Sequence, residues 1–184
     1  MKILKWLFIL AVIVVAGFIG FMSYMGMFSR PLISERNMGP YAVVYEEYTG
    51  PYQNMGKVFE KINKEMKEEG IEATRGLGIY LDDPMKVSPD KLRAQGGIII
   101  EDKDQPKVAG LKQKYSVMEI EVASCAVIEF PVKNNLSYML GPIKNYTLLS
   151  KYFSMKNYQM GKSYEIYDMP NKKIFYVMEI KKSE

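Results

Sequence analysis

The 184-residue chain is 48% hydrophobic and 25% charged, which is typical of one ordinary soluble domain with a short additional segment. Residues 31–184 carry 22 basic and 21 acidic side chains, so they offer no basic stripe for a nucleic-acid backbone. The lack of histidine and the single cysteine, Cys125, argue against a Ser-His-Asp or Cys-His centre and against a zinc site. No glycine-rich phosphate-binding loop occurs either. We therefore expect no metal, no cofactor and no nucleic-acid partner.

Residues 6–29 contain no charged side chain, and a helix of about 20 such residues spans the roughly 30 Å hydrocarbon core of a bilayer. A cleaved signal peptide is the alternative, because Lys2 and Lys5 form a basic start. The apolar run is longer than the about 7–15 residues of a signal-peptide core, and no Ala-x-Ala site closes it. We therefore expect residues 1–30 to be a membrane anchor. With Lys2 and Lys5 in the cytoplasm, the rest of this single-pass chain is predicted to lie outside it.

Turn formers and charges at residues 31–40 predict a linker before a domain at 41–184. The first half of that domain predicts a strand, an amphipathic helix and two more strands, at 41–48, 51–70, 76–81 and 92–101. The pair Gly96-Gly97 in the last of these strands predicts a bulge or a close backbone approach.

The second half repeats this order, with a short connecting strand at 115–120, a strand at 125–130, a helix within 136–157 and strands at 164–167 and 174–180. The start of this helix is open. Pro142 either occupies a first helical position after Gly141 or kinks a helix that begins at Asn135.

Two weakly similar segments indicate an internal duplication: GIYLDDP from Gly78 and YEIYDMP from Tyr164. Each follows a strand-like and a helix-like run at a similar distance. We predict an α+β fold in which two pseudo-symmetric strand-helix-strand-strand units, about 41–101 and 114–182, share an antiparallel sheet. The cleft between their helices is the predicted binding site for a small molecule.

Four segments resemble a known family: TGPYQNMGKVFEKI from Thr49, GLGIYLDDP from Gly76, VSPDKLRAQGGIII from Val87 and SYEIYDMP from Ser163. Over most of residues 41–184 the chain resembles the GyrI-like (gyrase-inhibitor-like) domains, which also form the effector-binding halves of AraC-type and MerR-type multidrug regulators. Because a span precedes the domain, it most resembles the membrane-anchored, testis-expressed reticulophagy-receptor-like members. The resemblance implies a cleft that binds lipophilic, often cationic compounds between aromatic walls, above an acidic residue. Some stand-alone members look like hydrolases of strained cyclopropane-bearing compounds.

Glu165 matches the acidic position of the family. Strand alternation places Glu165 and Tyr167 on one face of their strand. If that face lines the cleft, burial raises the pKa of Glu165 unless a cation or a hydrogen-bond donor compensates. Otherwise Glu165 points to water or pairs with Lys172 or Lys173.

Tyrosines are the expected walls of the cleft, because the only tryptophan, Trp6, lies in the anchor. We expect Tyr45, Tyr52 and Tyr80 near the cleft together with Tyr167, whose partner in the repeat is Tyr80. Cation-π attraction of roughly 0.5–2 kcal/mol for each ring would favour a hydrophobic cation above Glu165.

The leading hypothesis is a membrane-anchored domain that holds small amphipathic, often cationic molecules above Glu165. One alternative is a cofactor-independent hydrolase of strained small molecules in which Glu165 is catalytic. The other is a non-catalytic receptor or scaffold with a vestigial cleft. A monomer is the default expectation.

Overall fold

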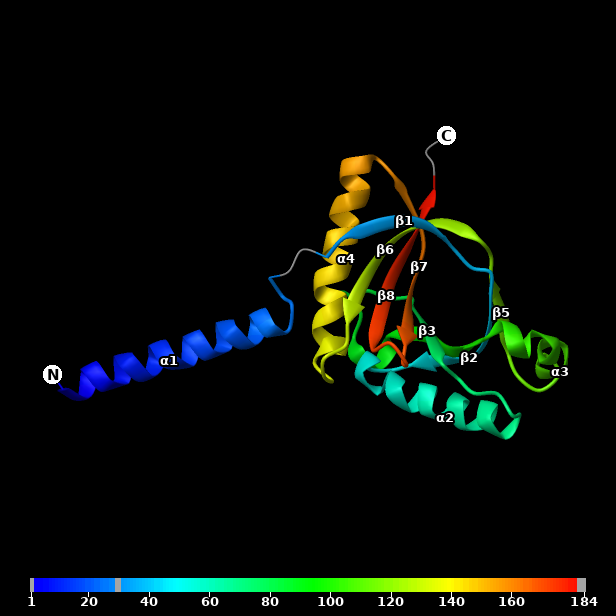
Figure 1. Ribbon diagram of the computed structural model, residues 1–184, viewed down its shortest axis with the longest axis horizontal. Coiled ribbons are helices and arrows are strands. Elements are labelled where there is room, and N and C mark those ends of the chain that lie inside the picture. Colours follow the sequence, from blue (N-terminus) through cyan, green and yellow to red (C-terminus); the bar gives the residue numbers. More distant parts are fainter. Residues whose placement is uncertain (1, 29–30, 182–184) are drawn as a thin grey trace.

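The computed structural model describes residues 2–28 and 31–181. An apolar helix precedes an α+β domain in which one antiparallel sheet curls into a half-barrel (Figure 1). The strands are β1 (Ile33–Met38), β2 (Tyr41–Thr49), β3 (Arg75–Tyr80), β4 (Arg93–Ile100), β5 (Val117–Ile120), β6 (Ala123–Pro131), β7 (Gln159–Asp168) and β8 (Lys173–Lys181). Their order in the sheet is β1-β6-β8-β7-β3-β4-β2-β5. The predicted α+β class and antiparallel sheet are confirmed.

Two helices cover one face of this sheet. α2 (Met55–Glu68) packs on β2 and β4, and α4 (Ser137–Lys156) packs on β6 and β8. A short helix, α3 (Val108–Leu111), and three 3-10 turns lie in the connections between strands. The opposite, inner face of the sheet is filled by its own apolar side chains, including Leu77, Ile166 and Val177.

The two halves of the domain meet where β3 pairs with β7. Gly78 lies opposite Glu165 in this ladder. The triplets Gly-Ile-Tyr at 78–80 and Glu-Ile-Tyr at 165–167 therefore occupy related positions in the two halves. In the ladder itself Tyr167 lies opposite Gly76, and Tyr80 corresponds to Tyr167 through the match of the two triplets. This match moves the alignment of the two repeat segments by one residue, because Gly78 corresponds to Glu165 rather than to Tyr164.

The amphipathic pattern of α2 explains how it lies on the sheet. Met55, Val58, Ile62 and Met66 recur at helical spacing and are all buried. Gly96 lets the start of the helix approach β4 closely, since a Cβ at that position would lie 2.6 Å from Cε of Met55. A Cβ at Gly97 would collide with the backbone oxygen of Val44, so the close backbone approach predicted at Gly96-Gly97 is confirmed at Gly97.

The prediction of a linker at residues 31–40 is wrong for most of its length. Residues 33–38 form β1, which pairs with β6 at the edge of the sheet. In the second half, the helix starts at Ser137 and includes Pro142, so α4 begins close to the earlier of the two predicted starts. It ends at Lys156, and the left-handed conformation of the next residue, Asn157 (φ 54°), closes the helix.

α1 (Lys2–Tyr24) extends away from the domain (Figure 1). Within the described residues it is the one helix long and apolar enough to cross a membrane, and the mean hydropathy of its most apolar 18-residue stretch is 2.5. None of its most apolar stretch is buried against the domain. A membrane anchor and a signal sequence share these properties.

Candidate functional site

Glu165 lies on the face of the sheet that the helices cover, at the centre of β7. Its side chain is 2% exposed, and within the described residues it forms no salt bridge. Burial is the main cause that raises the pKa of this carboxyl to about 7, while hydrogen bonds from Tyr167 and Tyr146 act in the opposite direction. The sequence-based expectation of a desolvated carboxyl at this position therefore matches the geometry.

A chain of hydrogen bonds leads from this carboxyl toward β3. Tyr167 donates its hydroxyl hydrogen to Oε2 of Glu165 at 2.7 Å, and the hydroxyls of Tyr80 and Tyr167 are 2.6 Å apart. Both tyrosines have a raised pKa because they are buried and face Glu165. Gly78 leaves room for this arrangement, since a Cβ there would lie 3.2 Å from the ring of Tyr80 and 3.4 Å from that of Tyr167.

Aromatic rings from both helices close the space above these groups. Phe59 of α2 meets Tyr167 edge to face, with ring centroids 5.2 Å apart. Tyr138 in the first turn of α4 lies on the other side of Tyr167 at 6.1 Å, and it is 48% exposed. Tyr138 is therefore the outer member of this aromatic wall. We call Tyr80, Tyr167, Phe59 and Tyr138, together with Glu165, the Glu165 cluster.

The predicted site tyrosines do not all lie in this cluster. Tyr52 is at its margin: its ring packs against Tyr80 with centroids 4.8 Å apart, and its hydroxyl bonds to the backbone of Asp82 and Arg93. Tyr45 lies on the opposite face of the sheet, packed against the inner core. The structure does not bring Tyr45 to the other predicted residues.

α4 and β8 contribute polar groups that the sequence did not single out. Tyr146 is a hydrogen-bond donor to Glu165. The amide of Asn145 and the hydroxyl of Tyr176 are buried near one another, and neither makes a well-formed hydrogen bond to any described residue. Alternation along β8 could have suggested Tyr176, but the uncertain start of α4 left the orientation of Tyr146 and Asn145 open.

The unpaired hydroxyl of Tyr176 leads to a stability prediction. Replacing Tyr176 by Phe should leave the free energy of unfolding unchanged or raise it by up to about 1 kcal/mol, because a buried hydroxyl without a partner among the described residues is removed. Tyr167→Phe, in contrast, loses the hydrogen bonds to Glu165 and Tyr80 and should cost about 1–3 kcal/mol. Urea unfolding of both variants measures the difference. Equal losses would contradict the prediction.

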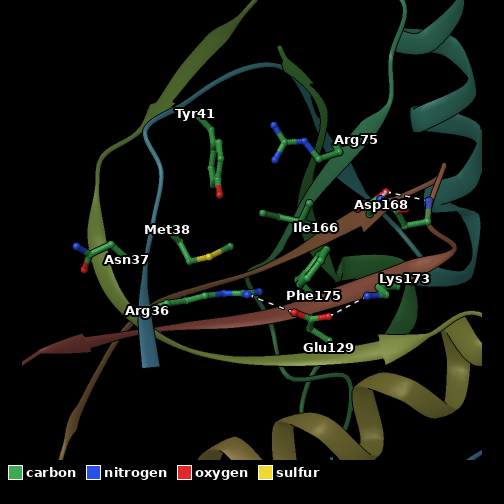
Figure 2. Close-up of a pocket in the computed structure, with 11 residues that line it drawn as sticks. Arg36, Asn37, Met38, Tyr41, Arg75, Glu129, Ile166, Asp168, Lys173 and Phe175 are labelled. Atoms are coloured by element: carbon green, nitrogen blue, oxygen red, sulfur yellow. Dashed lines mark hydrogen bonds and ion pairs between the residues drawn. The ribbon is translucent and has the colours of Figure 1, made fainter. Parts of the chain in front are cut away.

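A pocket of about 470 Å³ lies on the other face of the sheet, near β1 (Figure 2). Its walls include Tyr41, Ile166 and Phe175 and the charged side chains Arg36, Arg75 and Lys173. The guanidinium of Arg75 lies over the ring of Tyr41, and that of Arg36 lies over the ring of Phe175.

The cations of this pocket are already paired. Glu129 accepts hydrogen bonds from Arg36 at 3.2 Å and from Lys173 at 3.1 Å (Figure 2), and Arg75 is held by Glu101 at 2.6 Å. Lys173 therefore pairs with Glu129. The alternative expectation from the sequence, a pair between Lys173 and Glu165, is wrong. The buried carboxyl of Glu165, which has no cationic partner in the described part of the chain, is on the helix-covered face. Among the described residues no group of three or more His, Cys, Asp or Glu side chains is arranged to hold a metal.

The fold resembles those of several solved proteins. The C-terminal domain of EcmrR matches with a TM-score of 0.59 and 11% identity, over 83% of this chain and 99% of that one. EcmrR in a complex with DNA matches with a TM-score of 0.59 and 10% identity, over 99% of this chain and 69% of that one. SAV2435 bound to tetraphenylphosphonium matches with a TM-score of 0.52 and 12% identity, over 82% of this chain and 94% of that one.

Two sequence comparisons complete this result. No curated protein matches the chain, so the narrower likeness to reticulophagy-receptor-like proteins has no support from them. The model of the GyrI-like small-molecule-binding domain matches residues 33–180, which extend from the first residue of β1 into β8 and include α2 and α4. The chain therefore belongs to the GyrI-like small-molecule-binding domain family.

Proposed function

We propose that this domain binds lipophilic cations in the space that the Glu165 cluster now fills, with the Glu165 carboxylate as the counter-charge. The observation that carries the proposal is the burial of Glu165 without a positive side chain beside it among the described residues. A buried carboxylate is unstable unless it is protonated or paired. A cation that enters the cluster supplies the missing pair.

The surroundings of the carboxyl support a cation that is also apolar. The faces of Tyr80, Tyr167 and Phe59 offer cation-π attraction and apolar contact. Side chains occupy the space at present, so a ligand must displace part of the wall. Tyr138 is the half-exposed member and is the natural side chain to move.

Tetraphenylphosphonium is the probe of choice because the similar fold of SAV2435 has been solved with this compound. Isothermal titration into the full chain in a nonionic detergent should give binding that Glu165→Gln weakens by about thirtyfold or more, since truncating one partner of a buried charge pair costs about 2 kcal/mol at the least. Triphenylphosphine oxide, a neutral aryl compound, should bind weakly to both proteins.

The matched control is Glu119→Gln, which removes an exposed carboxylate at the β5 edge that pairs with Lys112. It should bind like the wild type. Undiminished binding of tetraphenylphosphonium by Glu165→Gln, or equal binding of the neutral compound, would contradict the role of the carboxylate as counter-charge. No binding of either compound by the folded wild type would favour a scaffold with an unused cleft.

A second candidate function is a hydrolase of strained small molecules. A carboxyl with a pKa of about 7 that receives a hydrogen bond from Tyr167 is suited to general acid-base catalysis near neutral pH. Turnover of a cyclopropane-bearing electrophile that disappears in Glu165→Gln would distinguish this function from binding alone.

We further propose that α1 is retained as a single-pass anchor, with the N-terminus in the cytoplasm and the domain on the other side. Contacts at its end support retention: Met25 is 1% exposed in the domain, and Lys133 and Lys144 donate hydrogen bonds to the carbonyls of Tyr24 and Gly26. N-terminal sequencing of the protein from membranes tests retention. A reporter fused after Glu184 that is active only in the cytoplasm should stay inactive.

A further inference from the structure

The outer side of α4 carries apolar side chains that the domain does not cover. Met139 is 55% exposed and Ile143 is 67% exposed, and Leu136 at the start of the helix is also exposed. Positions 136, 139 and 143 follow helical spacing and lie along one side of α4. This side of the helix faces away from the sheet, since α4 packs on β6 and β8 through Gly141, Leu149 and Phe153.

All charged side chains of the segment that contains α4 are positive. Between Glu129 and Glu165 the sequence has no acidic residue, and the basic ones are Lys133, Lys144, Lys151, Lys156 and Lys162. α2, the related helix of the other half, mixes lysines with glutamates at 60, 65 and 68. An exposed apolar strip on a helix whose own charges are all lysines is the pattern of a helix that lies at the surface of an anionic membrane. One acidic side chain of another element, Glu35 of β1, lies near the C-terminal end of α4, where it accepts a hydrogen bond from Tyr152 and interacts with Lys156.

The end of α1 fixes where this helix lies relative to a bilayer. Met25 is buried in the domain, with its Sδ atom 3.3 Å from Nδ2 of Asn134 just before α4. Lys133 and Lys144 contact the carbonyls of Tyr24 and Gly26. α1 thus leaves the domain at the α4 side, and α4 runs across its direction (Figure 1). If α1 stands in a membrane, α4 lies along the membrane surface.

We propose that the outer side of α4 docks on the surface of the same bilayer that α1 spans. Met139 and Ile143 enter the boundary between headgroups and acyl chains, and Lys151 and Lys156 meet anionic headgroups. This inference rests on the proposed retention of α1. It also brings Tyr138, the outer wall of the Glu165 cluster, to the membrane, so that a lipophilic cation can reach the cleft from the bilayer.

The test places an environment-sensitive nitrobenzoxadiazole probe on the full chain in lipid nanodiscs. Ile143→Cys labels the proposed surface, and Gln113→Cys labels an exposed turn after α3, on the side of the domain away from α1. Cys125 is fully buried, so the unsubstituted chain measures background labelling. Discs of phosphatidylcholine with phosphatidylglycerol are compared with discs of phosphatidylcholine alone, each with and without a doxyl-lipid quencher.

The probe at 143 should be quenched several-fold more than the probe at 113, most strongly in the anionic discs. Lys151→Glu with Lys156→Glu should reduce the quenching at 143 while leaving that at 113 unchanged. Equal quenching at 143 and 113 in both kinds of disc would overturn the proposal. Titration of tetraphenylphosphonium into the same discs measures ligand binding by the Glu165 cluster separately from docking. A chain that does not insert into discs at all would contradict the proposed anchoring by α1, on which the docking of α4 rests.

Discussion

Between pH 4.5 and about pH 8, the stability of the Glu165→Gln variant relative to the wild type should rise by about 3 kcal/mol, which corresponds to a carboxyl whose pKa rises from 4.5 to about 7 on folding. The folded wild type holds a proton on Glu165 between pH 4.5 and 7 that the unfolded chain releases. Its stability therefore falls as the pH rises through this window and stays constant with respect to this group above it. The amide of the substituted side chain cannot titrate, so the variant lacks this loss.

Urea unfolding of both proteins at pH values from 4 to 8 measures the effect as a difference. The free energies of unfolding of the two proteins, plotted against pH, should differ by a constant amount below pH 4.5. The difference should then grow up to about pH 7. Carboxyls with a lowered pKa act in a lower range: the Arg93 side chain is the main cause that lowers the pKa of Asp82 to about 2, so the stability from this pair is lost only as the pH falls below about 4. Curves that stay parallel to pH 8 would show that Glu165 is not desolvated.

Replacing Gly97 by Ala should cost about 3 kcal/mol of the free energy of unfolding, the upper part of the usual range for overpacking. A Cβ at this position would collide with the carbonyl oxygen of Val44, and it would lie 2.7 Å from Cγ1 of Val43. Val44 belongs to β2 and is held in register opposite Ile98 of β4. The backbone oxygen cannot move away without breaking this ladder.

Gly56→Ala is the matched control. Gly56 lies in the first turn of α2, and a Cβ there would meet no atom within 4 Å. Alanine should therefore stabilise the helix by up to about 1 kcal/mol. Thermal unfolding of the two variants should give midpoint changes of opposite sign. A Gly97→Ala midpoint at or above that of the wild type would contradict the structural reason given for this glycine.

The spacing of apolar residues and the positions of turn residues predicted those helices and strands that have one continuous apolar face. α2 shows one apolar face, and Gly50-Pro51 and Gly70 flank it in the sequence, so its place could be predicted. β1 could not, because the residues Ser-Glu-Arg-Asn at 34–37 are polar and their strand conformation depends on pairing with β6, which lies about 90 residues later. Edge strands are often this polar.

The site was predictable in part for a similar reason. Glu165 and Tyr167 alternate with the apolar residues Tyr164 and Ile166, so they had to share one face of β7. In β2, Val43 and Val44 are both buried, since both faces of that strand are covered. The alternation of apolar and polar residues then does not show which face of the sheet Tyr45 occupies. We expected it near the cleft, but it lies on the inner face. To predict that Tyr146 points to Glu165, one must know how α4 is rotated about its own axis, and the sequence pattern left this rotation open.

The raised pKa of Glu165, the carboxyl at the end of the hydrogen-bonded line from Tyr80 through Tyr167, makes the proposed cation binding an exchange reaction. Below about pH 7 the carboxyl is mostly protonated, so a cation that pairs with it must expel this proton. One proton should then leave for each cation that enters, and the apparent affinity should rise about tenfold per pH unit until the carboxyl is ionised. Titrations in buffers with different heats of ionisation would count that proton directly. A domain of this kind responds to the acidity of its surroundings as well as to the concentration of its ligand.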